Sequence, residues 1–146
     1  SREVQLHRDQ GRKALDGAVA AGVRKSQRIG TVYPDAPARG DPVREDNPRG
    51  PNGYMGGMRL AQEQVLWQAH AAGKIQATVV RLPDFYGPGV DKSLLHGAFQ
   101  AAVQGGKENL VGPLDLPPEF VFVPDVGPVV FRLIQQPEAF RNTWPR

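Results

Sequence analysis

The sequence contains no cysteine, which excludes disulfide bonds, thiolate nucleophiles and zinc sites built on thiolates. It has no apolar run that approaches the ~18 residues of a membrane-spanning helix, and no charged-then-apolar signal segment opens it. We therefore expect a soluble, cytoplasmic protein with no membrane partner. The three histidines are isolated from one another and from carboxylates at metal-ligand spacing, so we expect no metal site.

Aromatic residues are absent from the most basic part of the chain. The 18 Lys and Arg against 15 Asp and Glu give a net charge of +3, and the excess lies within residues 1–30. Surfaces that bind nucleic acids combine basic groups with aromatic rings on which bases stack. The pattern therefore indicates a solvated helix face, and we expect no nucleic-acid partner.

Glycine and proline, by contrast, are abundant, with 17 and 14 residues in a chain of 146. This length is typical of one domain, and the composition predicts many turns. The longest such stretch is the loop 34–53. Loops of this length inside compact domains are usually functional or mobile.

The apolar pattern alternates between helical and strand periods along the chain. Helical spacing predicts four helices, over 4–21, 58–72, 91–105 and 125–134. Short runs rich in β-branched and other apolar residues predict the strands between them, over 26–32, 75–82 and 120–123. Such alternation is typical of an α/β fold with a mostly parallel sheet. The polar residues 25–28 conflict with a buried parallel strand.

Local signals mark the ends of these elements and their buried faces. Asp91 and Asp125 are suitable N-caps for the last two helices, and Gly22 is a suitable residue after the first. The stripes within 95–103 and 126–134 recur at helical spacing. We expect both stripes to be buried.

The segment Arg81–Gly89, RLPDFYGPG, carries the densest chemistry. It directly follows a predicted strand, at the sheet edge where open α/β folds bind ligands. From the residues alone, a proline- and glycine-rich strand exit with an Arg–Asp pair is the alternative interpretation.

This segment resembles the LRxxNVYGPG segment of the NAD-dependent epimerase/dehydratase family, the extended short-chain dehydrogenases/reductases. DQGRKALDGAVAAGVRK, DPVREDNPRGPNGY and EFVFVPDVGPVV resemble three further stretches of that family, in the same order. The resemblance implies an enzyme with a Rossmann-type fold. Such an enzyme binds NAD or NADP and oxidises or isomerises a nucleotide sugar or a related alcohol, a small-molecule substrate.

The resemblance also implies catalytic residues. In the family a tyrosine acts as general acid/base, a lysine four residues later lowers its pKa, and a serine or threonine orients the substrate hydroxyl. Here Thr31 takes the Ser/Thr position. Two alignments are possible for the tyrosine and lysine positions. In the first, Tyr54 is the tyrosine and Met58 stands in the lysine position. In the second, which aligns Glu63 with a glutamate of the family, Met55 stands in the tyrosine position and Arg59 in the lysine position. The catalytic candidates are therefore Thr31, Tyr54 and Arg59.

Residues Pro83, Asp84, Phe85 and Tyr86 are the implied cofactor-binding residues. Asp84 replaces the asparagine of the family segment and would repel a phosphorylated ligand, so the substrate need not be an ordinary nucleotide sugar. The glycine turn that holds the dinucleotide pyrophosphate is absent from this chain. We expect a fragment: residues 1–146 form the C-terminal portion of a Rossmann-like, doubly wound parallel sheet without its first strands, with no separate second domain.

Two functions remain open. The chain is either part of an atypical oxidoreductase or a truncated, inactive relative that acts as a binding or dimerisation module. The family commonly dimerises through two helices that correspond to 4–21 and 58–72. Leu60 and Trp67 add a second apolar line to the latter helix.

Overall fold

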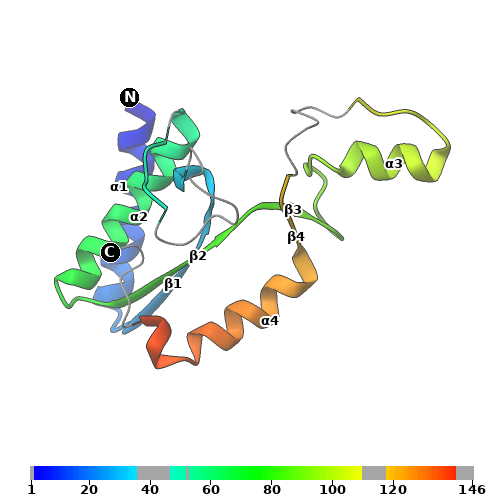
Figure 1. Ribbon diagram of the computed structural model, residues 1–146. Helices are drawn as coiled ribbons and strands as arrows, with labels where there is room; N and C mark the ends of the chain where they lie inside the picture. Colours follow the sequence, from blue (N-terminus) through cyan, green and yellow to red (C-terminus); the bar gives the residue numbers. More distant parts are fainter. Residues whose placement is uncertain (1, 36–46, 52, 110–117, 141–146) are drawn as a thin grey trace. The chain divides into compact units, whose positions relative to one another are not determined.

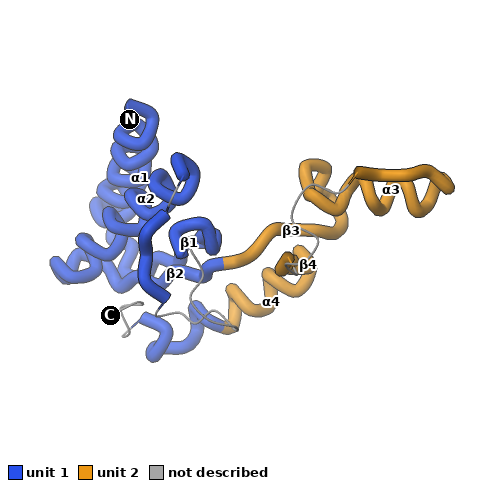
Figure 2. Tube along the Cα trace, turned by 45° about the horizontal axis from the view of Figure 1, so that its top comes forward, with its two compact units in different colours: residues 1–81, 133–146 blue, residues 82–132 orange. Residues whose placement is uncertain are grey.

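The computed structural model describes residues 2–35, 47–51, 53–109 and 118–140. These residues form a mixed α/β structure that divides into two compact units (Figures 1 and 2). Unit 1 takes the described residues of 1–81 and 133–146, and unit 2 takes those of 82–132. None of the helices in the described ranges is long and apolar enough to cross a membrane.

Unit 1 is built from two helices beside a two-stranded sheet. Its elements are α1 (Arg2–Ala20), β1 (Lys25–Thr31), the 3₁₀ turn η1 (Tyr33–Asp35), α2 (Tyr54–Ala71), β2 (Gln76–Leu82) and the 3₁₀ turn η2 (Pro137–Phe140). Helices α1 and α2 lie side by side (Figure 1), and β1 is hydrogen-bonded to β2. These helices and strands confirm the prediction for this half of the chain to within a few residues at each boundary.

The sequence conflict at residues 25–28 is resolved by the surroundings of β1. Only Gly30 of this strand is fully buried, and the other residues are partly or largely exposed. A strand in this setting accepts polar side chains, because most of its residues keep part of their surface in water. The prediction of a strand was therefore right, although it is not a buried one.

Helix α2 begins at Tyr54, four residues before the predicted start at residue 58. Its first turn packs against η1 so closely that a Cβ on Gly56 would lie 2.7 Å from the backbone oxygen of Tyr33. Glycine is required there by this close approach. The helix ends at Ala71, and Gly73 just beyond it has a left-handed φ of +69°, a conformation that glycine adopts without strain.

The apolar core of unit 1 is small and lies under α2. It consists of Met58, Val65, Leu66, Ile75, Ala77 and Phe140. Phe140 of η2 is 2% exposed, and the ammonium of Lys25 lies 5.0 Å from its ring centroid. The end of the described chain is thus attached to the first strand.

Unit 2 contains β3 (Asp84–Tyr86), α3 (His96–Gln104), β4 (Phe120–Phe122) and most of α4 (Val123–Ile134). Strands β3 and β4 pair in parallel, with Asp84 opposite Phe120 and Tyr86 opposite Phe122. The sequence indicated only a turn at residues 84–86. Three residues between Pro83 and Gly87 are too few to show a period.

Three expectations for unit 2 were wrong. Asp91 does not cap α3, whose N-cap is Leu95 without a side-chain hydrogen bond. Asp125 is not an N-cap either, because β4 runs directly into α4 and leaves Asp125 within its first turn. The predicted buried stripes are uncovered: Val103 of α3 is 88% exposed, and Val129 of α4 is 49% exposed.

Candidate functional site

Thr31 is the last residue of β1, at the point where the chain turns into η1. Its hydroxyl accepts a hydrogen bond from the backbone N–H of Tyr33 at 3.4 Å. This bond stabilises the turn that leaves the strand.

Tyr54 is the first residue of α2 and is 43% exposed. Its pKa is raised, first by partial desolvation and then by a hydrogen bond and charge from Glu3. A general base near neutral pH needs the opposite shift, which a neighbouring cation would provide. In this structure, the charged neighbour of the Tyr54 phenol is a carboxylate.

Arg59 lies further along the same helix, where its Nη1 donates to Gln62 Oε1 at 3.4 Å. Its Nε is buried and has no hydrogen-bond partner in the described part of the chain. The structure thus places Thr31, Tyr54 and Arg59 in unit 1, each against a different neighbour.

Residues Pro83–Tyr86 lie in unit 2, where Tyr86 is the centre of an aromatic cluster. Its ring is stacked on Phe99 with centroids 6.2 Å apart, and it contacts Phe120 and Phe122 at 6.5 and 5.3 Å. A Cβ on Gly87 would lie 2.9 Å from the Phe122 ring, and this residue has a φ of +121°. Glycine therefore permits both the turn and the packing.

The aromatic cluster borders a cavity of about 420 Å³. Aromatic and polar side chains share its wall, which includes Tyr86, Val90, Ser93, His96, Phe99 and Phe122. An apolar cavity with a few polar groups is the usual form of a small-molecule site.

A second group of side chains forms a buried ion-pair cluster in unit 1, made of Asp35, Arg49, Glu63 and Arg81. Arg49 pairs with Glu63 through Nη1 and with Asp35 through Nε at 3.5 Å. Arg81 pairs with Asp35 at 3.7 Å and with Glu63 at 3.7 Å. The cluster joins η1, residue 49, α2 and β2. Its ion pairs thus hold Asp35 and Arg49 against α2 and β2.

Burial dominates the electrostatics of this cluster. The Glu63 side chain is 1% exposed and the Asp35 side chain is 10% exposed. Desolvation raises the pKa of both carboxyl groups, and the opposing effect of Arg49 does not cancel it.

The ion-pair cluster was not predicted. Arg49 lies in the predicted loop 34–53, and the alternative interpretation of the segment Arg81–Gly89 paired its arginine with the aspartate of the same segment. The one available signal was Glu63 itself, a charged residue followed closely by the core residues Val65 and Leu66. The neighbouring residues 45 and 46 of that predicted loop lie outside the described residues.

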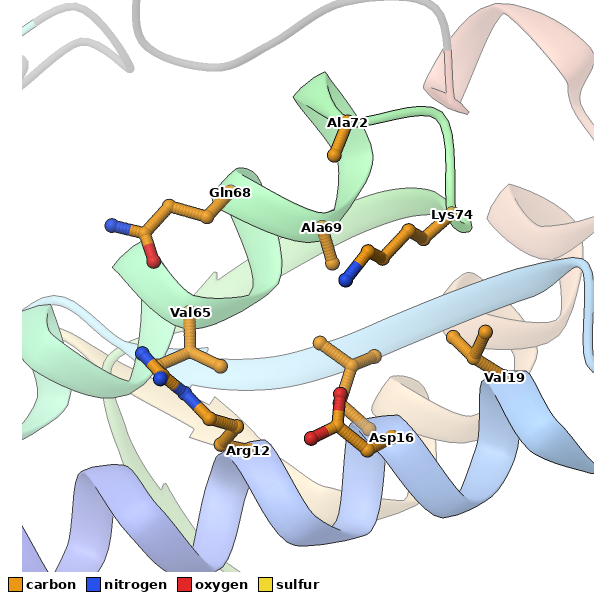
Figure 3. A pocket seen from close by; sticks show the side chains of 9 residues that line it. Arg12, Asp16, Val19, Val65, Gln68, Ala69, Ala72 and Lys74 are labelled. Carbon is orange, nitrogen blue, oxygen red and sulfur yellow. The ribbon is translucent and has the colours of Figure 1, made fainter.

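A groove also lies between α1 and α2 in unit 1. Its volume is about 330 Å³, and Figure 3 shows Arg12 and Asp16 of α1 facing Val65 and Ala69 of α2. Lys74 extends over one end of it. In the described part of the chain, no group of three or more histidine and acidic side chains could hold a metal ion.

The sequence model of the NAD dependent epimerase/dehydratase family matches residues 10–143. The chain belongs to this family. None of the curated proteins compared with it matches at the sequence level.

Solved structures show the same fold. The chain is similar to a UDP-glucuronic acid 4-epimerase from Bacillus cereus in complex with UDP-glucuronic acid and NAD, with 16% identity and a TM-score of 0.78 over 89% of this chain and 41% of that one. A dTDP-glucose 4,6-dehydratase from Streptomyces venezuelae gives 20% identity and a TM-score of 0.76, over 91% and 42%.

A GalE-like L-threonine dehydrogenase from Cupriavidus necator gives 19% identity and a TM-score of 0.78, over 92% and 45% of the two chains. The chain thus spans less than half the length of these three structures. It has the fold of one part of a Rossmann-like epimerase/dehydratase, which confirms the predicted family and fold class.

Proposed function

We propose that this chain forms the substrate-side part of an NAD(P)-dependent oxidoreductase that acts on a nucleotide sugar or a related alcohol. The observation that carries the proposal is the family match over residues 10–143, together with the aromatic cavity in unit 2. The similar structures named above include one with UDP-glucuronic acid and NAD and one with NAD bound.

The cavity supports a nucleotide-containing substrate through its rings. Phe99 is 54% exposed and lies parallel to Tyr86, with an interplanar angle of 21°. Exposed aromatic faces of this kind stack on nucleobases. Ser93 and His96 add hydrogen-bonding groups to the same wall, and polar groups of this kind fix the orientation of a ligand.

The catalytic roles are part of the same proposal. Thr31 orients the reacting hydroxyl, Tyr54 is the proton-transfer residue of one alignment, and Arg59 replaces the lysine of the other. Because the charged neighbour of Tyr54 is Glu3 and not a cation, the ordinary proton relay is weakened. Residues Pro83–Tyr86 contact the cofactor or the substrate, and Asp84 favours a ligand without a phosphate at that position.

Saturation-transfer NMR with UDP-glucose and with UDP-glucuronic acid tests the substrate class. We expect signals from the uridine protons with the wild-type chain and an affinity about five- to 150-fold weaker for Phe99→Ala, because stacking contributes about 1–3 kcal/mol per base. Phe131→Ala removes a ring that is 64% exposed on α4 and outside the cavity wall, and it should bind as the wild type does. Equal binding by both variants would reject the cavity as the substrate site.

Titration with NADH and NADPH, followed by the fluorescence of Trp67 and Trp144, tests the cofactor. We expect weak binding because the sequence of this chain contains no glycine turn after a strand. Submicromolar affinity would show that another part of the chain holds the pyrophosphate.

A second candidate function is that of a dimerisation module without catalytic activity. The observations that favour it are the apolar surface left on α1, where Leu6 is 55% exposed, and the groove between α1 and α2 in Figure 3. Light scattering at high protein concentration should then give the mass of a homodimer. A monomer would count against this candidate and leave the first one unaffected.

A further inference from the structure

Two arginines in unit 1 meet at one neutral oxygen. Arg28 of β1 donates from Nη2 to Gln62 Oε1 at 2.5 Å, and Arg59 of α2 donates from Nη1 to the same atom at 3.4 Å. An amide oxygen carries only a partial charge. The two guanidinium groups therefore lie close together with no full negative charge between them.

The buried carboxylates of unit 1 form ion pairs with other arginines. Asp35 and Glu63 pair with Arg49 and Arg81, and Glu63 Oε1 is buried with no hydrogen-bond partner in the described part of the chain. Within the described residues, neither Arg28 nor Arg59 forms an ion pair, and Arg59 Nε is buried without a hydrogen-bond partner. The pKa of Arg28 is lowered, first by burial and then by the charge of Arg59, against a smaller opposing effect of Glu63.

This arrangement is unfavourable unless an anion completes it. Burying a charge without a counter-charge is costly, and like charges at close range repel. A guanidinium presents a planar fork of donors that matches the oxygens of a carboxylate or phosphate. The guanidinium groups of Arg28 and Arg59, which both donate to Gln62 Oε1, are therefore suited to bind a single oxyanion.

A cavity gives access to this position. It has a volume of about 350 Å³ and is lined by residues of α1, β1 and α2, among which are Arg28 and Gln62 but not Arg59. Gln27 lines it as well, and both polar atoms of its side-chain amide are buried with no hydrogen-bond partner in the described part of the chain. Ala14, Leu15 and Ile29 contribute apolar wall.

We propose that Arg28 and Arg59, gathered by Gln62, form an oxyanion-binding site for a phosphate or carboxylate group. Gln27 supplies a further donor from the cavity wall. Binding at this site involves no redox step. Only the assignment of the anion, to a phosphate of the cofactor or to a carboxylate of the substrate, rests on the proposed function.

Calorimetric titration of the whole chain with inorganic phosphate and with acetate at low salt tests the site. We expect Arg28→Met and Arg59→Met each to weaken binding at least tenfold, while Arg28→Lys and Arg59→Lys retain part of it because they keep the charge. Arg24→Met changes an exposed arginine just before β1 and should bind as the wild type does. No binding of either anion by the wild type, or unchanged binding by both Met variants, would overturn the proposal.

Thermal unfolding separates an anion site from a structural hydrogen bond. In anion-free buffer Arg28→Met should unfold at the same or a higher temperature than the wild type, because it removes a repulsion. Added phosphate should raise the unfolding temperature of the wild type only, by mass action. A lower unfolding temperature for Arg28→Met without anion would mean that Arg28 only holds Gln62, which overturns the proposal.

Comparison of NADP⁺ with NAD⁺ identifies the source of the anion. Tighter binding of NADP⁺ that is lost in Arg59→Met assigns the site to a cofactor phosphate. Equal binding of the two, with acetate or phosphate still bound, assigns it to the substrate. Failure of both dinucleotides would agree with the absence of the glycine turn and leave phosphate and acetate binding as the support for the site.

Discussion

Unit 1 and unit 2 are each stabilised by a different kind of internal interaction. Unit 1 has a buried apolar core and, beside it, the ion-pair cluster of Asp35, Arg49, Glu63 and Arg81. In unit 2 none of the described residues is fully buried, and the packing depends on the rings around Tyr86. One unit is therefore sensitive to the loss of a charge, and the other to the loss of a ring.

This difference shows that an apolar pattern does not by itself produce a core. The apolar stripe of α4 is as regular as that of α2, yet Val129 and Ile134 are exposed and Val65 is buried. What α2 has in addition is a strand on one side and α1 on the other. Hydrophobic stabilisation follows the area removed from water, so a stripe contributes only where a second surface covers it.

The substitution with the largest expected effect on stability is Glu63→Ala. Removal of the carboxylate leaves Arg49 and Arg81 buried without a counter-charge at that end of the cluster, which should lower the free energy of unfolding of unit 1 by about 3–5 kcal/mol. Denaturant unfolding measures this loss. Hydrogen exchange should show faster exchange in β2 and unchanged exchange in β3.

Glu138→Ala is the matched control, because Glu138 is an exposed carboxylate in η2 of the same unit. It should change the free energy of unfolding by no more than about 0.5 kcal/mol. If both variants behaved alike, the ion-pair cluster would not be a stabilising feature of unit 1.

The ion-pair cluster also shows where prediction from the sequence ends. Periodicity gave the bounds of β1 and β2 within one residue, because local spacing determines them. The cluster joins residues from 35 to 81, and no local pattern states which distant charge will meet which. A loop charge such as Arg49 has the same sequence signature whether it is solvated or buried.

For the candidate site residues, too, only part of the arrangement follows from the sequence. The strand-end position of Thr31 and the segment around Tyr86 follow from the order of elements. The neighbours that decide their chemistry, such as Glu3 beside Tyr54 and Gln62 between two arginines, come from packing between elements. The sequence therefore predicts the place of a residue in the fold more reliably than it predicts the neighbours of that residue.

Tyr86→Ala tests the other half of the comparison. The ring of Tyr86 contacts three other rings, and aromatic pairs contribute about 0.5–1.5 kcal/mol each beyond their buried area. We expect a loss of about 1–3 kcal/mol that is confined to unit 2, measured by hydrogen exchange of β3 and β4. Phe131→Ala, on an exposed ring, should leave this exchange unchanged, and equal effects of the two would show that no ring is central.

A pH series sharpens the description of the ion-pair cluster. Because the pKa of Glu63 in the folded chain is raised above its ordinary value of 4.5, the folded state binds this proton more tightly than the unfolded state does. The contribution of Glu63 to stability is therefore complete below that ordinary value and falls as the pH rises through the raised pKa.

Measured against Glu63→Gln, which cannot titrate, the wild type should lose stability as the pH increases over this range. Denaturant unfolding at a series of pH values measures the difference between the two chains. A difference that instead grows with pH would mean that Arg49 and Arg81 outweigh desolvation, so that the pKa is lowered.

The smallest expected effect concerns the contact between Lys25 and Phe140, which attaches η2 to β1. The ammonium lies 5.0 Å from the ring centroid, and a cation–π contact at an exposed site contributes about 0.5–1 kcal/mol. Lys25→Met keeps the length of the side chain and removes its charge, so it should lower the free energy of unfolding of unit 1 by that amount. Lys13→Met removes an exposed lysine of α1 and serves as the control. Because Phe140 is almost completely buried, its apolar packing should persist in Lys25→Met, and a loss as large as that of Glu63→Ala would show that charge and not packing holds η2 in place.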